Sequence, residues 1–158
     1  MDLFNRLRIK DVMVKPVYTI FDEEDLLAAH EKFVAHSVSY LCVLDHSERL
    51  VGLISRKYLY KTKSPMKISD GQNIYDKNIV IDGDSYFDRD MLSGFHIRSI
   101  MHQNPPTIGP EALVSEAIIS MAKKRIGCIP VVNNDRKVLG IMTNQDIVNI
   151  TADILQQK

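Results

Sequence analysis

Residues 128–146 read CIPVVNNDRKVLGIMTNQD, and a matching stretch at 40–58 reads YLCVLDHSERLVGLISRKY. In both stretches an apolar run, a polar turn and a second apolar run with an internal glycine precede a hydroxyl residue. Two apolar runs joined by a short polar turn predict a β-hairpin. The hydroxyl residue that follows is typical of the start of a helix. One hairpin–helix unit is therefore predicted twice.

The repeat extends outward from these stretches. Residues 9–60 align with 97–148 without a gap at an offset of 88 residues, and eight of the 52 positions are identical. The identical pairs are Ile9/Ile97, Met13/Met101, Thr19/Thr107, Ile20/Ile108, Glu23/Glu111, Ala29/Ala117, Val43/Val131 and Gly52/Gly140. Further positions, such as Phe33/Met121, are apolar in both copies. The same burial pattern at the same spacing predicts one supersecondary unit used twice.

Each copy predicts the order βαββα. An extended piece at 17–20 precedes a helix, for which Asp22 is the expected N-cap. In the second copy Pro110 is expected at the first helical position. One such unit cannot cover both faces of its sheet, so we expect an α/β (α+β) fold in which two repeats pack through their sheets with pseudo-two-fold symmetry.

The predicted organisation is a first repeat at 9–61, an insert at 62–96 and a second repeat at 97–150, with the last helix continuing to 156. The insert is rich in glycine and aspartate, and it contains the apolar run Ile79-Val80-Ile81, which is a candidate strand. Long connections of this kind are often functional. We expect the insert to form a lid or an extra interaction surface.

Composition excludes several classes of protein. A chain of 158 residues with 45% hydrophobic residues can bury one core. The 20 basic and 20 acidic residues cancel, which argues against nucleic acid as the main partner. No signal peptide and no apolar run of the ~20 residues that span a membrane are found, so a cytoplasmic protein is expected. Cys42 and Cys128 lie in apolar runs and are interpreted as buried thiols, with a disulfide as the alternative.

Catalytic and metal-binding patterns are weak. The five histidines lack zinc-ligand spacing. The acidic run Asp82, Asp84, Asp88 and Asp90 lacks the glycine and the final glutamate of a calcium loop, which favours a solvated acidic loop. No phosphate-binding glycine loop or nucleophile motif occurs. We therefore expect a protein that is not an enzyme and has no resident cofactor or metal.

The repeated pattern resembles the cystathionine-β-synthase (CBS) domain, which occurs as a tandem pair called a Bateman module. The second copy carries the resemblance best, in IRSIM at 97–101, CIPVVN at 128–133 and GIMTNQD at 140–146. The first copy departs from it twice: Cys42 replaces the proline found at 130, and Tyr58 replaces the aspartate found at 146.

The resemblance implies a regulatory module that senses an adenosine-containing metabolite such as AMP, ADP, ATP or S-adenosylmethionine in a cleft between the repeats. Asp146 is expected to hold the ribose hydroxyls, and Thr143 and the helix start to face phosphates. The other expected ligand-binding residues are Asn144, Met13, Pro16, Val17, Tyr18, Ser39 and Tyr40. From the residues alone, TNQD at 143–146 is also explained as a helix cap without a ligand.

The apolar residues of the last predicted helix indicate a protein partner. The last helix carries Ile147, Ile150 and Ile154 on one side, and exposed apolar faces usually find a partner, so a homodimer is expected. A regulated effector would be a separate protein. The alternative function is a structural dimerisation module with no bound nucleotide.

Overall fold

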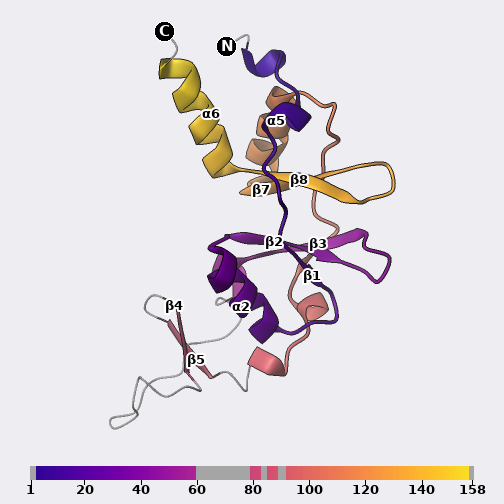
Figure 1. Ribbon diagram of the computed structural model, residues 1–158, viewed down its shortest axis with the longest axis vertical. Helices are drawn as coiled ribbons and strands as arrows, with labels where there is room; N and C mark the ends of the chain where they lie inside the picture. Colours follow the sequence, from indigo (N-terminus) through magenta and orange to yellow (C-terminus); the bar gives the residue numbers. More distant parts are fainter. Residues whose placement is uncertain (1–2, 60–78, 83–84, 89–91, 157–158) are drawn as a thin grey trace. The chain divides into compact units, whose positions relative to one another are not determined.

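The computed structural model describes residues 3–59, 79–82, 85–88 and 92–156. The chain divides into two compact units that interleave along the sequence. Unit 1 contains residues 1–17, 46–50 and 104–158, and unit 2 contains residues 18–45 and 51–103. Each unit has its own buried hydrophobic cluster. Helices and sheets occur in both, so the expected α+β class is confirmed (Figure 1).

Unit 2 is built on a four-stranded sheet in the order β1-β2-β3-β6. The strands are β1 (Thr19–Phe21), β2 (Tyr40–Leu44), β3 (Leu50–Ser55) and β6 (His102–Gln103). β1 is parallel to β2, and β6 is antiparallel to β3. The helices are α2 (Leu26–His36) and the short α3 (Arg56–Leu59). Leu26, Ala29 and Phe33 of α2 are fully buried against this sheet, as their helical spacing predicts.

Unit 1 repeats this plan. Its elements are α1 (Ile9–Val12), α5 (Val114–Lys124), β7 (Cys128–Val132), β8 (Val138–Thr143) and α6 (Asn144–Gln156). β7 and β8 are antiparallel, Ile108 bridges Val131 in parallel, and Val14 bridges Ile141 in antiparallel orientation. Both α5 and α6 lie on the same face of the β7–β8 hairpin (Figure 1). The helix starts predicted after Ser55 and Thr143 are confirmed.

Backbone hydrogen bonds repeat at the 88-residue offset. Arg56 N donates to Ser39 O at 2.9 Å, and Asn144 N donates to Gly127 O at 3.0 Å. The left-handed residues repeat as well: Ser37 and Arg125 end α2 and α5 with φ of 52° and 53°. Equivalent residues therefore adopt equivalent conformations, even where their side chains differ.

The segments that lead into each repeat are exchanged. Ile9 N donates to Ala112 O in unit 1, and its equivalent Ile97 N donates to Glu24 O in unit 2. The 3-10 helix Ile97–Ser99 and β6 thus complete the first repeat, while α1 and Val14 complete the second. This exchange was not predicted from the sequence.

Two expected helix starts are wrong. Asp22 is not the N-cap of α2: the helix begins at Leu26, and Asp25 caps it by accepting a hydrogen bond from Ala28 N at 2.8 Å. Pro110 is not the first residue of α5, which begins at Val114. The physical reason is the exchanged segment, because Pro110 O accepts a hydrogen bond from Lys10 N and so is held outside the helix.

Part of the insert is described. β4 (Ile79–Asp82) and β5 (Ser85–Asp88) pair as an antiparallel hairpin, which confirms a strand at Ile79-Val80-Ile81. Leu92 is buried in the cluster of unit 2. Most of the predicted lid, and Asp84 and Asp90 of the acidic run, lie outside the described residues. The two cysteines are buried thiols, without the alternative disulfide.

Candidate functional site

The N-terminal turn of α6 holds the strongest candidate residues. Asp146 Oδ2 accepts hydrogen bonds from Thr143 N at 2.7 Å and from Thr143 Oγ1 at 2.6 Å. The Thr143 hydroxyl also lies 3.3 Å from Asp146 N. These contacts form a reciprocal cap, because the hydroxyl and the carboxylate each satisfy a backbone N–H at the helix start. The capping hydrogen bonds that TNQD predicts are therefore present.

The cap uses one oxygen of the carboxylate. Within the described part of the chain, Asp146 Oδ1 has no hydrogen-bond partner, and the side chain is half-buried. A carboxylate held by its other oxygen is a fixed acceptor, and its open oxygen suits a hydroxyl donor. Capping and ligand binding are thus compatible at this residue. Asn144, whose backbone N–H is bonded to Gly127 O, presents an exposed side chain beside it.

Three of the expected ligand-binding residues, Met13, Pro16 and Val17, lie in the segment that precedes β1 and belongs to unit 1. Val14 N donates to Ile141 O at 2.8 Å, and Ile141 N donates back to Val14 O at 3.2 Å. This pairing is antiparallel, so the chain that follows Val14 runs away from Thr143. Pro16 and Val17 follow Val14 in that direction, whereas Met13 lies on the Thr143 side of the bridge. The Met13 side chain packs on Gly140 of β8.

Tyr18, Ser39 and Tyr40 belong to unit 2. Tyr18 precedes β1, and its carbonyl accepts a hydrogen bond from Cys42 N of β2 at 3.2 Å. Ser39 is exposed and Tyr40, half-buried, begins β2. The Tyr18 ring stacks on His36, which was not among the predicted residues. No periodic or motif signal marks His36, because the stacking depends on where α2 ends in space.

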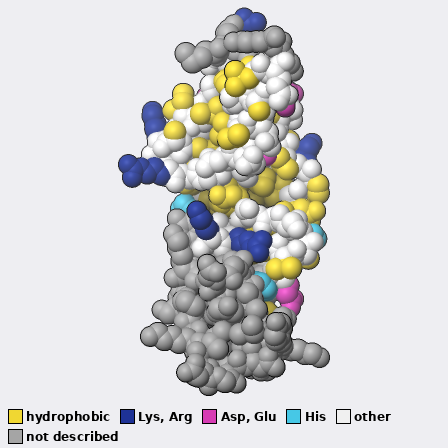
Figure 2. Space-filling model, turned by 90° about the vertical axis from the view of Figure 1, so that its left-hand side faces the viewer, with side chains coloured by type: hydrophobic (Ala, Val, Ile, Leu, Met, Phe, Trp, Pro, Cys, Tyr) yellow, Lys and Arg dark blue, Asp and Glu magenta, His cyan; other side chains and the backbone are white. Residues whose placement is uncertain are grey.

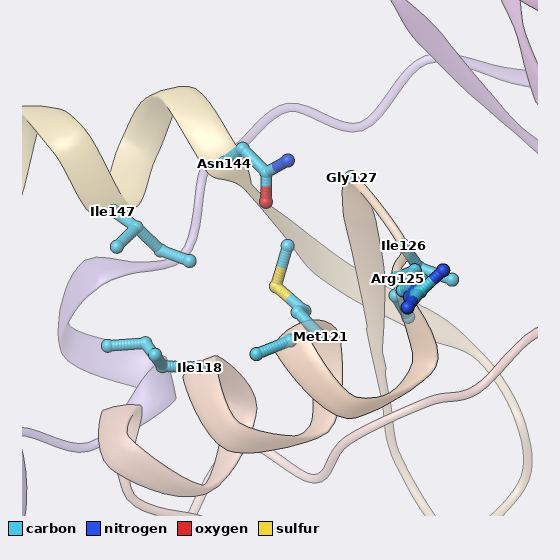
Figure 3. Close-up of a pocket in the computed structure, with 8 residues that line it drawn as sticks. Ile118, Met121, Arg125, Ile126, Gly127, Asn144 and Ile147 are labelled. Carbon is cyan, nitrogen blue, oxygen red and sulfur yellow. The ribbon is translucent and has the colours of Figure 1, made fainter.

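An open groove of 380 Å³ lies between α5 and α6 of unit 1. Its lining is mostly apolar: Ile118, Met121, Ala122, Arg125, Ile126, Gly127, Asn144 and Ile147. Ile118 and Met121 from α5 and Ile147 and Asn144 from α6 point toward the same space (Figure 3). Asn144 thus belongs both to the groove and to the turn that contains Asp146.

An ion-pair cluster joins the segment before β1 to the loop before α5 in unit 1. Lys10 Nζ lies 2.9 Å from Glu111 Oε1, and Arg8 donates to Glu111 O at 2.6 Å. The hydrogen bond from Lys10 lowers the pKa of the Glu111 carboxyl. These residues are exposed and hold the leading segment to the loop before α5, so they have a structural role.

Among the described residues, no helix has the length and hydropathy needed to cross a membrane. In that same part of the chain, no three histidine, cysteine or acidic side chains come together in a way that suits a metal ion.

Comparison with known proteins settles the family. A sequence profile of the CBS domain matches residues 9–64 and 97–153, which together make up most of the chain. The chain belongs to the CBS domain family. It is a tandem CBS pair, and the matched segments correspond to the two repeats.

Relatives of this CBS pair differ in size. It is 26% identical over 152 residues to a CBS domain-containing protein of Dictyostelium discoideum and spans 95% of that protein. It is 25% identical over 139 residues to an L-aspartate semialdehyde sulfurtransferase of Methanocaldococcus jannaschii, of which it spans 22%. CBS pairs therefore occur in these relatives both nearly alone and as part of longer enzymes.

Solved structures share the fold. The CBS pair of protein MJ0100, solved with 5'-methylthioadenosine and S-adenosylmethionine, has a TM-score of 0.71 at 23% identity, with 93% of this chain and 97% of that chain covered. A CBS domain-containing protein of Bacillus anthracis has a TM-score of 0.72 at 21% identity, with 96% and 97% covered.

Proposed function

We propose that this CBS pair is a regulatory module that binds an adenosine-containing metabolite, with Asp146 accepting hydrogen bonds from the ribose hydroxyls. The main support for the proposal is the hydrogen bonding of the Asp146 carboxylate. Its Oδ2 accepts hydrogen bonds from Thr143, whereas its Oδ1 has no hydrogen-bond partner among the described residues. The adenosine ligands in the MJ0100 structure support the ligand class. AMP, ADP, ATP and S-adenosylmethionine all carry the diol.

The chemistry favours a diol over other groups at this turn. A ribose offers two neighbouring O–H donors, and an ionised carboxylate only accepts. Because Thr143 already orients Asp146, little side-chain freedom is lost when the ligand binds. The amide side chain of Asn144 can donate to or accept from the same ligand. In this proposal the ligand acts as a regulator of a separate effector protein, and the chain itself catalyses no reaction.

Calorimetric titration with AMP, ATP and S-adenosylmethionine tests this proposal. Asp146→Ala should weaken binding roughly 10- to 150-fold, since a hydrogen bond to a charged group contributes about 1.5–3 kcal/mol. Asp146→Asn keeps a capping side chain and should also weaken binding. Asp153→Asn is the matched control, because it removes an exposed carboxylate from the same helix. Equal affinity in all four proteins, or no binding by the wild type at millimolar ligand, would contradict the proposal.

The second candidate is a structural dimerisation module without a nucleotide, and the groove between α5 and α6 favours it. The sequence predicts Ile147 and Ile150 on an exposed face, but both pack against the hydrophobic cluster of unit 1. The exposed apolar side chains of α6 are instead Val148 and Leu155, at 59% and 63%. Ile119 of α5 is 53% exposed. Hydrophobic side chains are visible on this face of unit 1 in Figure 2.

We propose a second copy of the chain as the occupant of this groove. Protruding apolar side chains and an apolar groove on the same unit are the two halves of a self-complementary contact, which a two-fold dimer requires. A thermal-shift panel of nucleotides separates the two candidate functions, because only the sensor is stabilised by a ligand.

The two buried thiols support a reducing, cytoplasmic location in either case.

A further inference from the structure

The turn between β7 and β8 holds the end of the turn between β2 and β3. Residues 46–50 belong to unit 1, as does the whole β7–β8 hairpin. Leu50 N donates a hydrogen bond to Arg136 O at 2.9 Å. In return, the Arg136 guanidinium donates to Leu50 O, from Nη2 at 2.8 Å and from Nε at 3.2 Å. Arg136 thus engages both backbone groups of Leu50, and its side chain supplies the donor that a neighbouring strand would otherwise provide.

A second contact between the two turns is ionic. Lys137 Nζ donates to Ser47 O and lies 3.8 Å from Glu48 Oε2. Residues 45–49 contain two acidic side chains and one basic side chain, a net charge of −1 with histidine neutral. Residues 133–137 contain one acidic side chain and two basic ones, a net charge of +1. The two turns are therefore complementary in charge, and opposite charges attract.

The backbone conformation separates the role of the Arg136 side chain from that of the turn. Glu48 and Arg136 are equivalent at the 88-residue offset, and both are left-handed, with φ of 57° and 60°. Glycine adopts this conformation with the least strain, and a residue with a Cβ atom is uncommon there. Glycine would therefore suit the turn better, so the arginine at this position indicates a need for its side chain.

Two like turns could not make these contacts. If residues 45–49 met a second turn of the same kind, Glu48 would take the place of Arg136, and a carboxylate cannot donate to Leu50 O. If residues 133–137 met their own kind, Arg136 and Lys137 would face the same two cations, and like charges repel. The contacts are therefore specific to the pairing of unlike turns.

We propose that Arg136, together with Lys137, determines which turn the β7–β8 hairpin accepts, and that it selects the 46–50 turn of the first repeat over a turn of its own kind. Hydrogen-bond donors and charge set this specificity, since the backbone conformation is the same in both turns. The contact includes no residue of the Asp146 turn, so it does not depend on either candidate function.

Two glycine substitutions test the role of Arg136. Arg136→Gly relieves the left-handed backbone but removes the guanidinium, so the urea midpoint should fall by roughly 0.3–1 M. Arg125→Gly is the matched control, because Arg125 is also left-handed, with φ of 53°, and its side chain has no ion pair among the described residues. The midpoint of this control should stay the same or rise. A midpoint for Arg136→Gly equal to or above that of the wild type would overturn the proposal.

An exchange of charges tests the selection of unlike turns. Glu48→Lys gives the first turn two adjacent basic residues, as in the second turn, so it should lower the urea midpoint more than Glu48→Gln, which only removes the ion pair. The double variant Glu48→Lys/Lys137→Glu restores opposite charges, and its loss should be smaller than the sum of the two single losses. These differences should shrink in about 1 M salt. Additive losses, or equal midpoints for Glu48→Lys and Glu48→Gln, would contradict the selection of unlike turns.

Discussion

Met13 packs directly on the Cα of Gly140, so that a methyl group added to this glycine would lie 2.6 Å from the Met13 sulfur and 2.8 Å from its Cγ. The equivalent contact joins Met101 to Gly52 in unit 2. Both glycines and both methionines are among the identical positions of the repeat. Each pair attaches an exchanged leading segment to the strand beneath it, β8 or β3.

Gly140→Ala should therefore destabilise the protein by about 1–3 kcal/mol, the range typical of overpacking. Urea denaturation at equilibrium measures the change. Gly109→Ala is the control, because an added methyl group there has no neighbour within 4 Å and Gly109 is exposed. In the double variant with Met13→Ala the effects should be less than additive. Additive effects would contradict the proposed contact.

The two acidic caps should have similar effects on stability and different effects on ligand binding. Asp25→Ala and Asp146→Ala each remove a side chain that accepts from a helix N–H, so each should cost ~1 kcal/mol. Gln145→Ala, at an exposed site, should change stability by less than about 0.5 kcal/mol. Thermal unfolding with and without AMP gives both quantities. A loss of AMP stabilisation in Asp25→Ala as large as that in Asp146→Ala would show that capping alone explains the effect.

The buried thiol of Cys42 should make stability fall at high pH. Burial raises the pKa of this thiol to about 12, from a value near 9 in the unfolded chain. Between these values the unfolded chain loses the proton while the folded chain keeps it, so this contribution to stability is complete below pH 9 and is lost as pH rises toward 12.

The urea midpoint of the wild type should accordingly fall more steeply above pH 9 than that of Cys42→Ala, which has no thiol to titrate. The difference between the two proteins isolates Cys42 from the lysines and tyrosines that titrate in the same range. Parallel pH profiles for both proteins would contradict the prediction.

The exposed face of α6 should control self-association. Val148→Asp and Leu155→Asp each place a charge at an exposed apolar position of α6, and burying an unpaired charge in a dimer contact is costly. Light scattering should show a dimer for the wild type and a monomer, with a mass near 18.0 kDa, for these variants. Asn149→Asp adds the same charge to an exposed polar position of α6 and should remain a dimer. A monomeric wild type at tens of micromolar would contradict the proposed interface.

The sequence determined the features that depend on neighbouring residues. Apolar runs and turn chemistry predicted two hairpins with short polar turns, and the α6 cap follows from Thr143 and Asp146 three residues apart. The 88-residue offset predicted that the two repeats fold alike, and their backbone hydrogen bonds agree at that offset.

Only the tertiary structure decided which repeat each leading segment completes. Ile9 and Met13 have identical counterparts in Ile97 and Met101, so local energies cannot distinguish pairing with one repeat from pairing with the other. The same choice explains why α2 and α5 begin at Leu26 and Val114, beyond the expected N-cap Asp22 and the expected first residue Pro110. The carbonyl oxygens of Asp22 and Pro110 accept hydrogen bonds from the exchanged segments. The Tyr18–His36 stack is of the same kind: it joins residues 18 apart whose contact exists only once α2 has packed on its sheet.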